Sequence, residues 1–174
     1  AGSGNAYTPT LDDFDIAIVS EIEGDDYRVV HAAAPEGTVG AGDHFELAET
    51  YCAMTMCGDG VVAIDVMGES PQRGHPCYKK FGLESYIGIP LVVRGERYGT
   101  LNFSSPKPRD TKWDERDRLM MEIIAGWVTA HLERKAAQQD LQDTLQMLSL
   151  LGRSRRIGWW RVDGPGAPKP AGQR

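Results

Sequence analysis

Residues 82–91, with the sequence GLESYIGIPL, and residues 98–105, with the sequence YGTLNFSS, decide the fold of this chain. Within them, two runs rich in β-branched and aromatic side chains, residues 86–93 and 98–104, lie on either side of a short polar break that contains Gly95. Two such runs joined by a few turn-forming residues are typical of a β-hairpin. The sequence therefore predicts a pair of antiparallel strands in this region.

A second hairpin is predicted near the start of the chain. Residues 15–21 and 27–33 read as strands, and the polar residues 23–26 between them form the turn. Because strands and long helices do not alternate regularly, the sequence predicts an α+β fold with one central antiparallel sheet flanked by helices. Between the hairpins we expect a short helix at 48–57, a buried strand at 61–66 and a brief helix at 77–81.

A long amphipathic helix is predicted to follow the sheet, with Asp114 as its N-cap. No glycine or proline interrupts residues 127–151, and seam positions recur at alternating steps of four and three, the spacing of a coiled coil. We expect a parallel homodimer through the part beyond Glu133; the alternative is a helix that packs back on its own domain. The seam positions are Ile123, Trp127, Ala130, Arg134, Ala137, Leu141, Thr144, Leu148 and Leu151, of which Arg134 and Thr144 are polar.

Length and composition are those of one globular domain with a tail. The 174 residues are 41% hydrophobic and 25% charged, close to the average of globular proteins. The longest apolar runs, such as residues 87–93, are shorter than the roughly 18 residues that a membrane span needs, so we expect no contact with a membrane. The domain is expected at residues 14–134, after an N-terminal segment at 1–13 and before a linker helix at 135–152 and a tail at 153–174.

Charge and cysteine content narrow the range of partners. The net charge of −6 disfavours binding of nucleic acid, because a negatively charged protein does not attract phosphate groups. The one local basic cluster, Arg153, Arg155 and Arg156, lies in the tail. The sequence shows no secretory signal, and its odd number of cysteines lacks CxxC spacing. We therefore expect a cytoplasmic protein with reduced thiols and no structural zinc site. The cysteines are Cys52, Cys57 and Cys77.

The quoted residues 82–91 and 98–105 resemble the second half of a GAF domain. In that family the paired strands are followed by an acidic residue before a terminal helix, and residues 113–117 (WDERD) match this feature. The resemblance covers residues 14–134. It implies a fold related to that of PAS domains, with a central antiparallel sheet and a long C-terminal signalling helix.

The resemblance also implies a function. GAF domains hold a small ligand in a cup over the sheet, so the chain is expected to be a sensor rather than an enzyme, with a ligand that the sequence does not identify. Residues 49–52 (ETYC) are similar to a bacterial subgroup found in sensor kinases, and residues 151–163 resemble the opening strand of a PAS domain. These matches imply a multidomain signalling protein, such as a histidine kinase of a two-component system. The residues expected to bind the ligand are Tyr51, Cys52, Asp65, Cys77, Tyr86 and Asn102.

Two interpretations of the cysteines stay open. Bilin-binding relatives attach their chromophore through a cysteine in the region of Cys77, although such sites usually have a histidine where Tyr78 stands here. Methionine sulfoxide-reducing relatives suggest a thiol-based redox role for Cys52, Cys57 or Cys77, although Cys52 and Cys57 would lie about 140° apart around a helix. The four histidines lack metal-ligand spacing and no catalytic triad can be assembled, so no metal and no catalytic residue is predicted.

Overall fold

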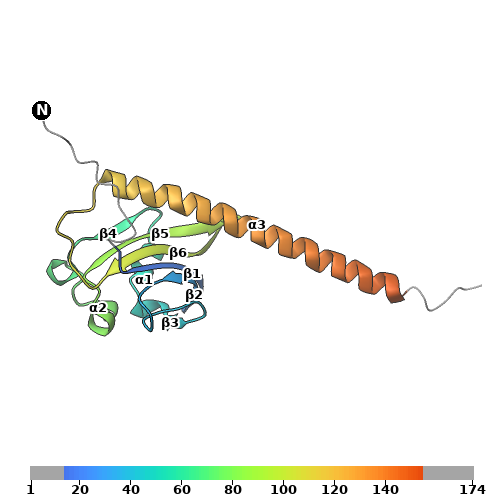
Figure 1. Ribbon diagram of the computed structural model, residues 1–174, viewed down its shortest axis with the longest axis horizontal. Helices are drawn as coiled ribbons and strands as arrows, with labels where there is room; N and C mark the ends of the chain where they lie inside the picture. Colours follow the sequence, from blue (N-terminus) through green and yellow to red (C-terminus); the bar gives the residue numbers. More distant parts are fainter. Residues whose placement is uncertain (1–13, 155–174) are drawn as a thin grey trace, which may run out of the picture. The chain divides into compact units, whose positions relative to one another are not determined.

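The computed structural model describes residues 14–154, with side chains up to Leu151. Figure 1 shows an α+β domain in which a sheet lies between α3 on one side and the short helices on the other. The elements are β1 (Ile16–Glu23), β2 (Asp26–Ala33), β3 (His44–Glu46), the 3-10 turn η2 (Leu47–Glu49), α1 (Cys52–Met56), β4 (Val62–Ile64), the 3-10 turn η3 (Met67–Glu69), α2 (Pro76–Phe81), β5 (Ser85–Val93), β6 (Glu96–Ser105) and α3 (Glu115–Ser154).

The six strands form one antiparallel sheet in the order β3-β2-β1-β6-β5-β4, which confirms the predicted fold class. Both predicted hairpins are present. In the β5–β6 hairpin the turn residues Arg94 and Gly95 have φ values of 54° and 83°. Two positive φ angles in a two-residue turn suit the right-handed twist of the paired strands, and glycine adopts such an angle without steric cost.

The two faces of the sheet bury different side chains. On β6, Leu101 and Phe103 join one hydrophobic cluster together with residues of α3. The alternating residues Thr100, Asn102 and Ser104 are also buried, but they point to the opposite face, because successive side chains of a strand alternate. Strand β6 therefore serves two cores at once, one apolar and one with polar groups.

The long helix begins as predicted. The Asp114 carboxylate accepts hydrogen bonds from the backbone amides of Arg116 (2.8 Å) and Asp117 (3.0 Å), and the Asp117 carboxylate accepts one from the amide of Asp114 (3.0 Å). This reciprocal arrangement is a capping box with aspartate in the role of the usual glutamate.

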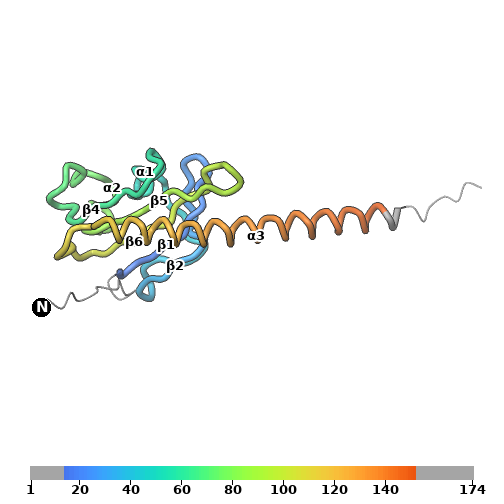
Figure 2. The backbone as a smooth tube through the Cα atoms, turned by 90° about the horizontal axis from the view of Figure 1, so that it is seen from above, coloured from blue at the N-terminus to red at the C-terminus, as the bar shows by residue number. Residues whose placement is uncertain are grey.

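The first part of α3 covers one face of the sheet, as the views in Figures 1 and 2 agree. Met121, Ala125 and Leu132 are buried there, at the spacing of one helix face. The exposed fractions of Ile123 and Trp127 are 46% and 76%. These two seam residues therefore do not belong to the core of the domain. The seam was expected beyond Glu133, but the exposed apolar residues of α3 already begin about three turns before Glu133.

Two predicted elements are shorter than expected. The segment 48–57 is not one helix, because Thr50 adopts an extended conformation between η2 and α1 and its hydroxyl donates to the carbonyl of Leu47 (2.9 Å). Such local bonds of threonine compete with helix formation. The strand predicted at 61–66 is reduced to β4, at the edge of the sheet.

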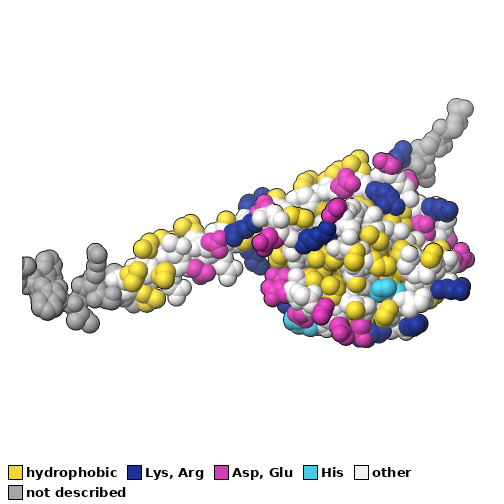
Figure 3. Space-filling view, turned by 180° about the vertical axis from the view of Figure 1, so that it is seen from behind, with side chains coloured by type: hydrophobic (Ala, Val, Ile, Leu, Met, Phe, Trp, Pro, Cys, Tyr) yellow, Lys and Arg dark blue, Asp and Glu magenta, His cyan; other side chains and the backbone are white. Residues whose placement is uncertain are grey.

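Contacts divide the chain into two units, Ala1–Arg134 and Lys135–Arg174. The described part of the second unit is the rest of α3, on which Leu141, Leu145, Leu148 and Leu151 are exposed; hydrophobic side chains recur along it in Figure 3. Most of the possible PAS strand, residues 155–163, lies outside the described residues. Among the described helices, none is long and apolar enough to cross a membrane.

Candidate functional site

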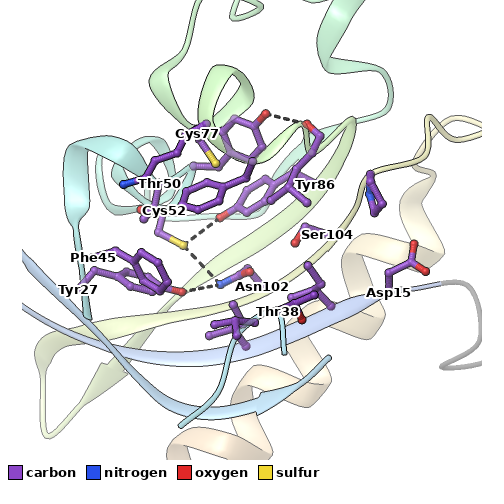
Figure 4. Close-up of a pocket in the computed structure, with 18 of the residues that line it drawn as sticks. Asp15, Tyr27, Thr38, Phe45, Thr50, Cys52, Cys77, Tyr86, Asn102 and Ser104 are labelled. Atoms are coloured by element: carbon purple, nitrogen blue, oxygen red, sulfur yellow. Dashed lines mark hydrogen bonds between the residues drawn. The ribbon is translucent and has the colours of Figure 1, made fainter. Parts of the chain in front are cut away.

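A cavity of about 470 Å³ lies on the face of the sheet opposite α3 (Figure 4). Strands β1, β2, β5 and β6 form its floor, and the loop 35–39, β3, α1 and α2 surround it. Most of the lining is apolar or aromatic. The lining residues are Asp15, Ile16, Ile18, Tyr27, Pro35, Thr38, Val39, Phe45, Thr50, Tyr51, Cys52, Cys77, Lys80, Phe81, Leu83, Tyr86, Asn102, Ser104 and Pro106.

The thiol of Cys52 is the centre of a buried hydrogen-bond network at the floor of the cavity. Its Sγ accepts hydrogen bonds from Thr100 Oγ1 (3.1 Å), Asn102 Nδ2 (3.4 Å) and Tyr86 Oη (3.6 Å). Asn102 Nδ2 also donates to Tyr27 Oη (3.3 Å), as Figure 4 shows. The network joins α1 to β2, β5 and β6, so it fixes the relative positions of the elements that enclose the cavity.

The same network extends beneath the cavity through hydroxyl groups. Thr55 Oγ1 and Tyr86 Oη share a hydrogen bond of 2.6 Å, and both side chains are fully buried. The ring of Tyr86 lies across Gly88, where an added Cβ would come within 2.2 Å of Tyr86 Oη. A larger residue at position 88 would therefore collide with this tyrosine and displace it.

Burial favours the neutral form of the thiols and phenols that line the cavity. It raises the pKa of Cys52, and it raises the pKa of Cys77 to about 12. Burial likewise raises the pKa of both Tyr27 and Tyr86 well above the ordinary value. At neutral pH these groups offer hydrogen bonds but no charge.

Five of the six predicted ligand-binding residues line the cavity, namely Tyr51, Cys52, Cys77, Tyr86 and Asn102. Asp65, the sixth, does not. Its carboxylate accepts a hydrogen bond from the amide of Trp113 (2.7 Å), and its carbonyl accepts one from the amide of Arg109 (3.1 Å). Asp65 therefore fixes the loop that leads into α3, which is the loop-capping role that short polar side chains commonly have.

Several lining residues were missed by the sequence reasoning. Ser104 could have been found, because it shares a strand face with Asn102 two positions away. Asp15, Thr38 and Phe45 come from segments far away in the sequence, and no local pattern marks them.

The cysteines are not equivalent in the structure. Cys52 and Cys77 are buried beside the cavity, whereas Cys57 is exposed at the end of α1. The two sulfurs of α1 thus lie in different environments, as expected from their spacing on a helix. In the part of the chain that is described, no group of three or more His, Cys, Asp or Glu side chains could hold a metal ion.

Comparison with known proteins identifies the fold. A family model described as GAF domain matches residues 13–132. The GAF domain of PixJ from Thermosynechococcus elongatus, in its blue-light absorbing form, is 16% identical, with 79% of this chain and 84% of that chain covered and a TM-score of 0.60. No curated protein sequence matches significantly.

Two further solved structures share the fold. The GAF domain of an Acinetobacter phosphoenolpyruvate-protein phosphotransferase is 11% identical, covering 74% of this chain and 77% of that chain, with a TM-score of 0.57. The type II free methionine-R-sulfoxide reductase of Thermoplasma acidophilum is 15% identical, covering 68% and 79%, with a TM-score of 0.54. At these identities the likeness concerns the fold alone.

Proposed function

The chain belongs to the GAF domain family, and we propose that it is a sensory module that binds a small, mainly apolar ligand in the cavity described above. GAF domains are in general sensory or regulatory. The observation that carries the proposal is the cavity itself. Its volume of about 470 Å³ lies in the range of small-molecule sites, and its apolar walls with a few convergent polar groups have the composition of such sites.

Strand β6 supplies a route by which the bound state would reach the rest of the protein. Asn102 and Ser104 face the cavity, while Leu101 and Phe103, on the same strand, pack in the cluster that contains Met121 and other residues of α3. Close-packed cores transmit displacement because they have little free volume. We propose that a ligand shifts the balance between two packings of α3 and so controls a downstream output such as a histidine kinase.

We further propose that two copies of the chain associate through α3. Five large apolar seam residues are exposed, namely Ile123, Trp127, Leu141, Leu148 and Leu151. Burial of a leucine-sized side chain gains about 1.5–3 kcal/mol, so a seam of this length supplies useful affinity against the cost of association. The partner that this spacing suits is a second, parallel copy of the same helix.

The dimer is tested by replacing Leu141 and Leu148 together with Asp. Sedimentation should show a concentration-dependent dimer for the original chain and a monomer for the variant, with an unchanged circular dichroism spectrum of the domain. As a matched control, Gln139 and Gln146, which lie on the helix face opposite the seam, are replaced with Asp. A double seam variant that stays dimeric would show that α3 is not the interface.

Two alternatives from the sequence are less well supported. A redox role of Cys52, Cys57 or Cys77, or attachment of a bilin at Cys77, needs a reactive thiolate. Burial raises the pKa of the Cys52 and Cys77 thiols, which opposes thiolate formation at neutral pH. Cys57 is exposed and does not line the cavity. The structures similar to this one include a phycocyanobilin-bound GAF domain and the reductase, but they share only the fold.

Ligand binding is tested by native mass spectrometry and an absorbance spectrum of the purified protein. Ile18→Trp places an indole in the cavity from β1 and should abolish retention of any small molecule, whereas Val92→Trp, at an exposed position of β5, should not. Absorbance in the visible range would favour a bilin. If no compound is retained and no compound in a screen of apolar molecules raises the melting temperature, the proposal is wrong.

A further inference from the structure

We propose that the cavity selects an amine: a molecule with an apolar, aromatic body and one cationic hydrogen-bond donor, which binds to Asp15 and Ser104. This inference rests on the proposed ligand-binding function and specifies the chemical class of the ligand. Two properties of the lining support it: the hydrogen bonds that its polar groups can still form, and the charges that these groups carry.

Two hydroxyl groups on the lining have already used their protons. Thr38 Oγ1 donates to the carbonyl of Pro35 (2.6 Å), and Thr50 Oγ1 donates to the carbonyl of Leu47 (2.9 Å). Because a hydroxyl has one proton and two lone pairs, each of these groups can only accept a hydrogen bond from a ligand. These two lining positions therefore favour a ligand that donates.

One end of the cavity carries a carboxylate. Asp15 immediately precedes β1, whose first residue, Ile16, pairs with Ser104 of β6. The register places Asp15 beside Ser104 and Ser105, and the Ser105 hydroxyl donates a hydrogen bond to one of its carboxylate oxygens. The second oxygen stays available as an acceptor, since an ionised carboxylate has about four lone-pair sites. Ser104, next to Ser105 on β6, is buried and also lines the cavity.

The charges around the cavity do not offset this carboxylate. The cationic side chain on the lining, Lys80, forms an ion pair with Glu49, so the two together add no net charge. The buried thiols and phenols stay neutral because burial raises their pKa. Asp15 thus gives the cavity lining a negative net charge. A cationic group within about 4 Å of this partly buried carboxylate is favoured, and an anionic group is disfavoured.

Aromatic rings at the other end of the cavity suit the body of such a ligand. Phe45 contacts Tyr27 and Phe81, with ring centroids 6.1 and 5.8 Å apart. The first pair is tilted and the second is edge-to-face, and both arrangements leave ring faces and edges for a further aromatic group. The cavity therefore offers an apolar end and an anionic end, which an aromatic amine would occupy together.

The experiment compares ligands that share a body and differ in one group. The panel is tryptamine, indole-3-propionate and tryptophol, with phenethylamine, 3-phenylpropionate and 2-phenylethanol as a smaller set, measured by calorimetry at pH 7. We expect each amine to bind at least about tenfold more tightly than its carboxylate, with the alcohol between them.

Variants assign the preference to the named residues. Asp15→Asn should bring the amine and carboxylate affinities within about threefold of each other, because it removes the charge and keeps the shape. Asp25→Asn, at the exposed β1–β2 turn away from the cavity lining, removes the same charge and should leave the ratio unchanged. Ser104→Ala should weaken the amine and the alcohol, since both lose a hydrogen-bond partner.

The outcomes separate this inference from the proposed function. Carboxylates that bind as tightly as amines, or a ratio that Asp15→Asn does not change, would overturn the inference and leave the ligand-binding function intact. If none of the six compounds binds, the molecule retained in native mass spectrometry decides: an amine supports the inference and an anion overturns it. No binding and no retained molecule would overturn both.

Discussion

The effects of Tyr86→Phe and Thr55→Val on the free energy of unfolding should be strongly coupled, because the two hydroxyl groups that these changes remove bond each other. Their oxygens lie 2.6 Å apart, and both residues are fully buried. Tyr86→Phe leaves the Thr55 hydroxyl buried without this partner. Thr55→Val leaves the Tyr86 hydroxyl with only the distant Cys52 Sγ at 3.6 Å. A buried polar group that loses its partner costs about 1–3 kcal/mol, so each single change should destabilise by about that amount.

The double variant should be much less destabilised than the sum of the single ones. When both hydroxyls are removed, no polar group is stranded, and only the net value of the hydrogen bond is lost, about 0.5–1.5 kcal/mol. The single variants together should cost about 2–6 kcal/mol, so we expect a coupling free energy of at least about 0.5 kcal/mol, and of about 3 kcal/mol at the middle of these ranges.

The assay is urea unfolding followed by circular dichroism, at fixed protein concentration because the chain is proposed to dimerise. Thr55→Val combined with Tyr98→Phe, at a partly exposed tyrosine on β6, is the control pair and should be additive within about 0.5 kcal/mol. If the free energies of Tyr86→Phe and Thr55→Val also add, the hydrogen bond does not hold α1 to β5 and the description of the cavity floor is wrong.

Three further changes test other parts of the structure. Gly99→Ala should destabilise by about 1–3 kcal/mol or more in urea unfolding, because its Cβ would lie 2.0 Å from the carbonyl oxygen of Ser20, whereas Gly60→Ala, in an open loop, should cost much less. The pKa of Cys77, raised to about 12 in the folded chain from an ordinary 9.0, makes the folded state keep a proton that the unfolded state loses. The contribution of Cys77 to stability should therefore be constant below about pH 9 and fall above it by up to about 1.4 kcal/mol per pH unit, so Cys77→Ala should reduce the slope of stability against pH; an unchanged slope between pH 9 and 10.5 would contradict the burial of the thiol. Asp114→Ala should cost about 0.5–2 kcal/mol through loss of the N-cap, and Asp114→Asn should restore most of it; equal losses in both would show that the cap is not what stabilises the start of α3.

The fold could be predicted because its signals are local. The β5–β6 hairpin has a polar turn with Gly95 between two strand-like runs, and the start of α3 has Asp114 and Asp117 at the spacing of a capping box. Each signal involves residues within a few positions of each other, where backbone preferences act directly. The one helix that was mispredicted, at 48–57, is interrupted by a single side-chain bond of Thr50 that competes with the helix.

The site could be predicted only in part, because strands that are distant in the sequence bring its residues together by lying next to each other in the sheet. Tyr51, Cys52, Tyr86 and Asn102 belong to segments whose resemblance to a known family was visible. Asp15 reaches the cavity only because β1 pairs with β6, which brings together residues that are 90 positions apart, as the Ser105–Asp15 hydrogen bond shows. Asp65 was misplaced for the same reason. A carboxylate at the end of a strand can face a cavity or cap a loop, and only the position of Trp113 decides between them.

Only the β-sheet separates the cavity from α3, so a ligand in the cavity could affect the helix through the strands of the sheet. A displacement of the β6 backbone at Asn102 would also move Leu101 and Phe103, because the three share one strand and the apolar pair packs in the α3 cluster. The tip of the same hairpin is also fixed to the helix, since Glu133 Oε1 accepts a hydrogen bond from the amide of Arg94 (3.1 Å). Glu133 is the next-to-last residue of the first unit, so this bond joins the sheet to the last turn of α3 that belongs to that unit. A displacement of β6 would therefore act on the part of α3 that belongs to the first unit at two places, over the core and at Glu133.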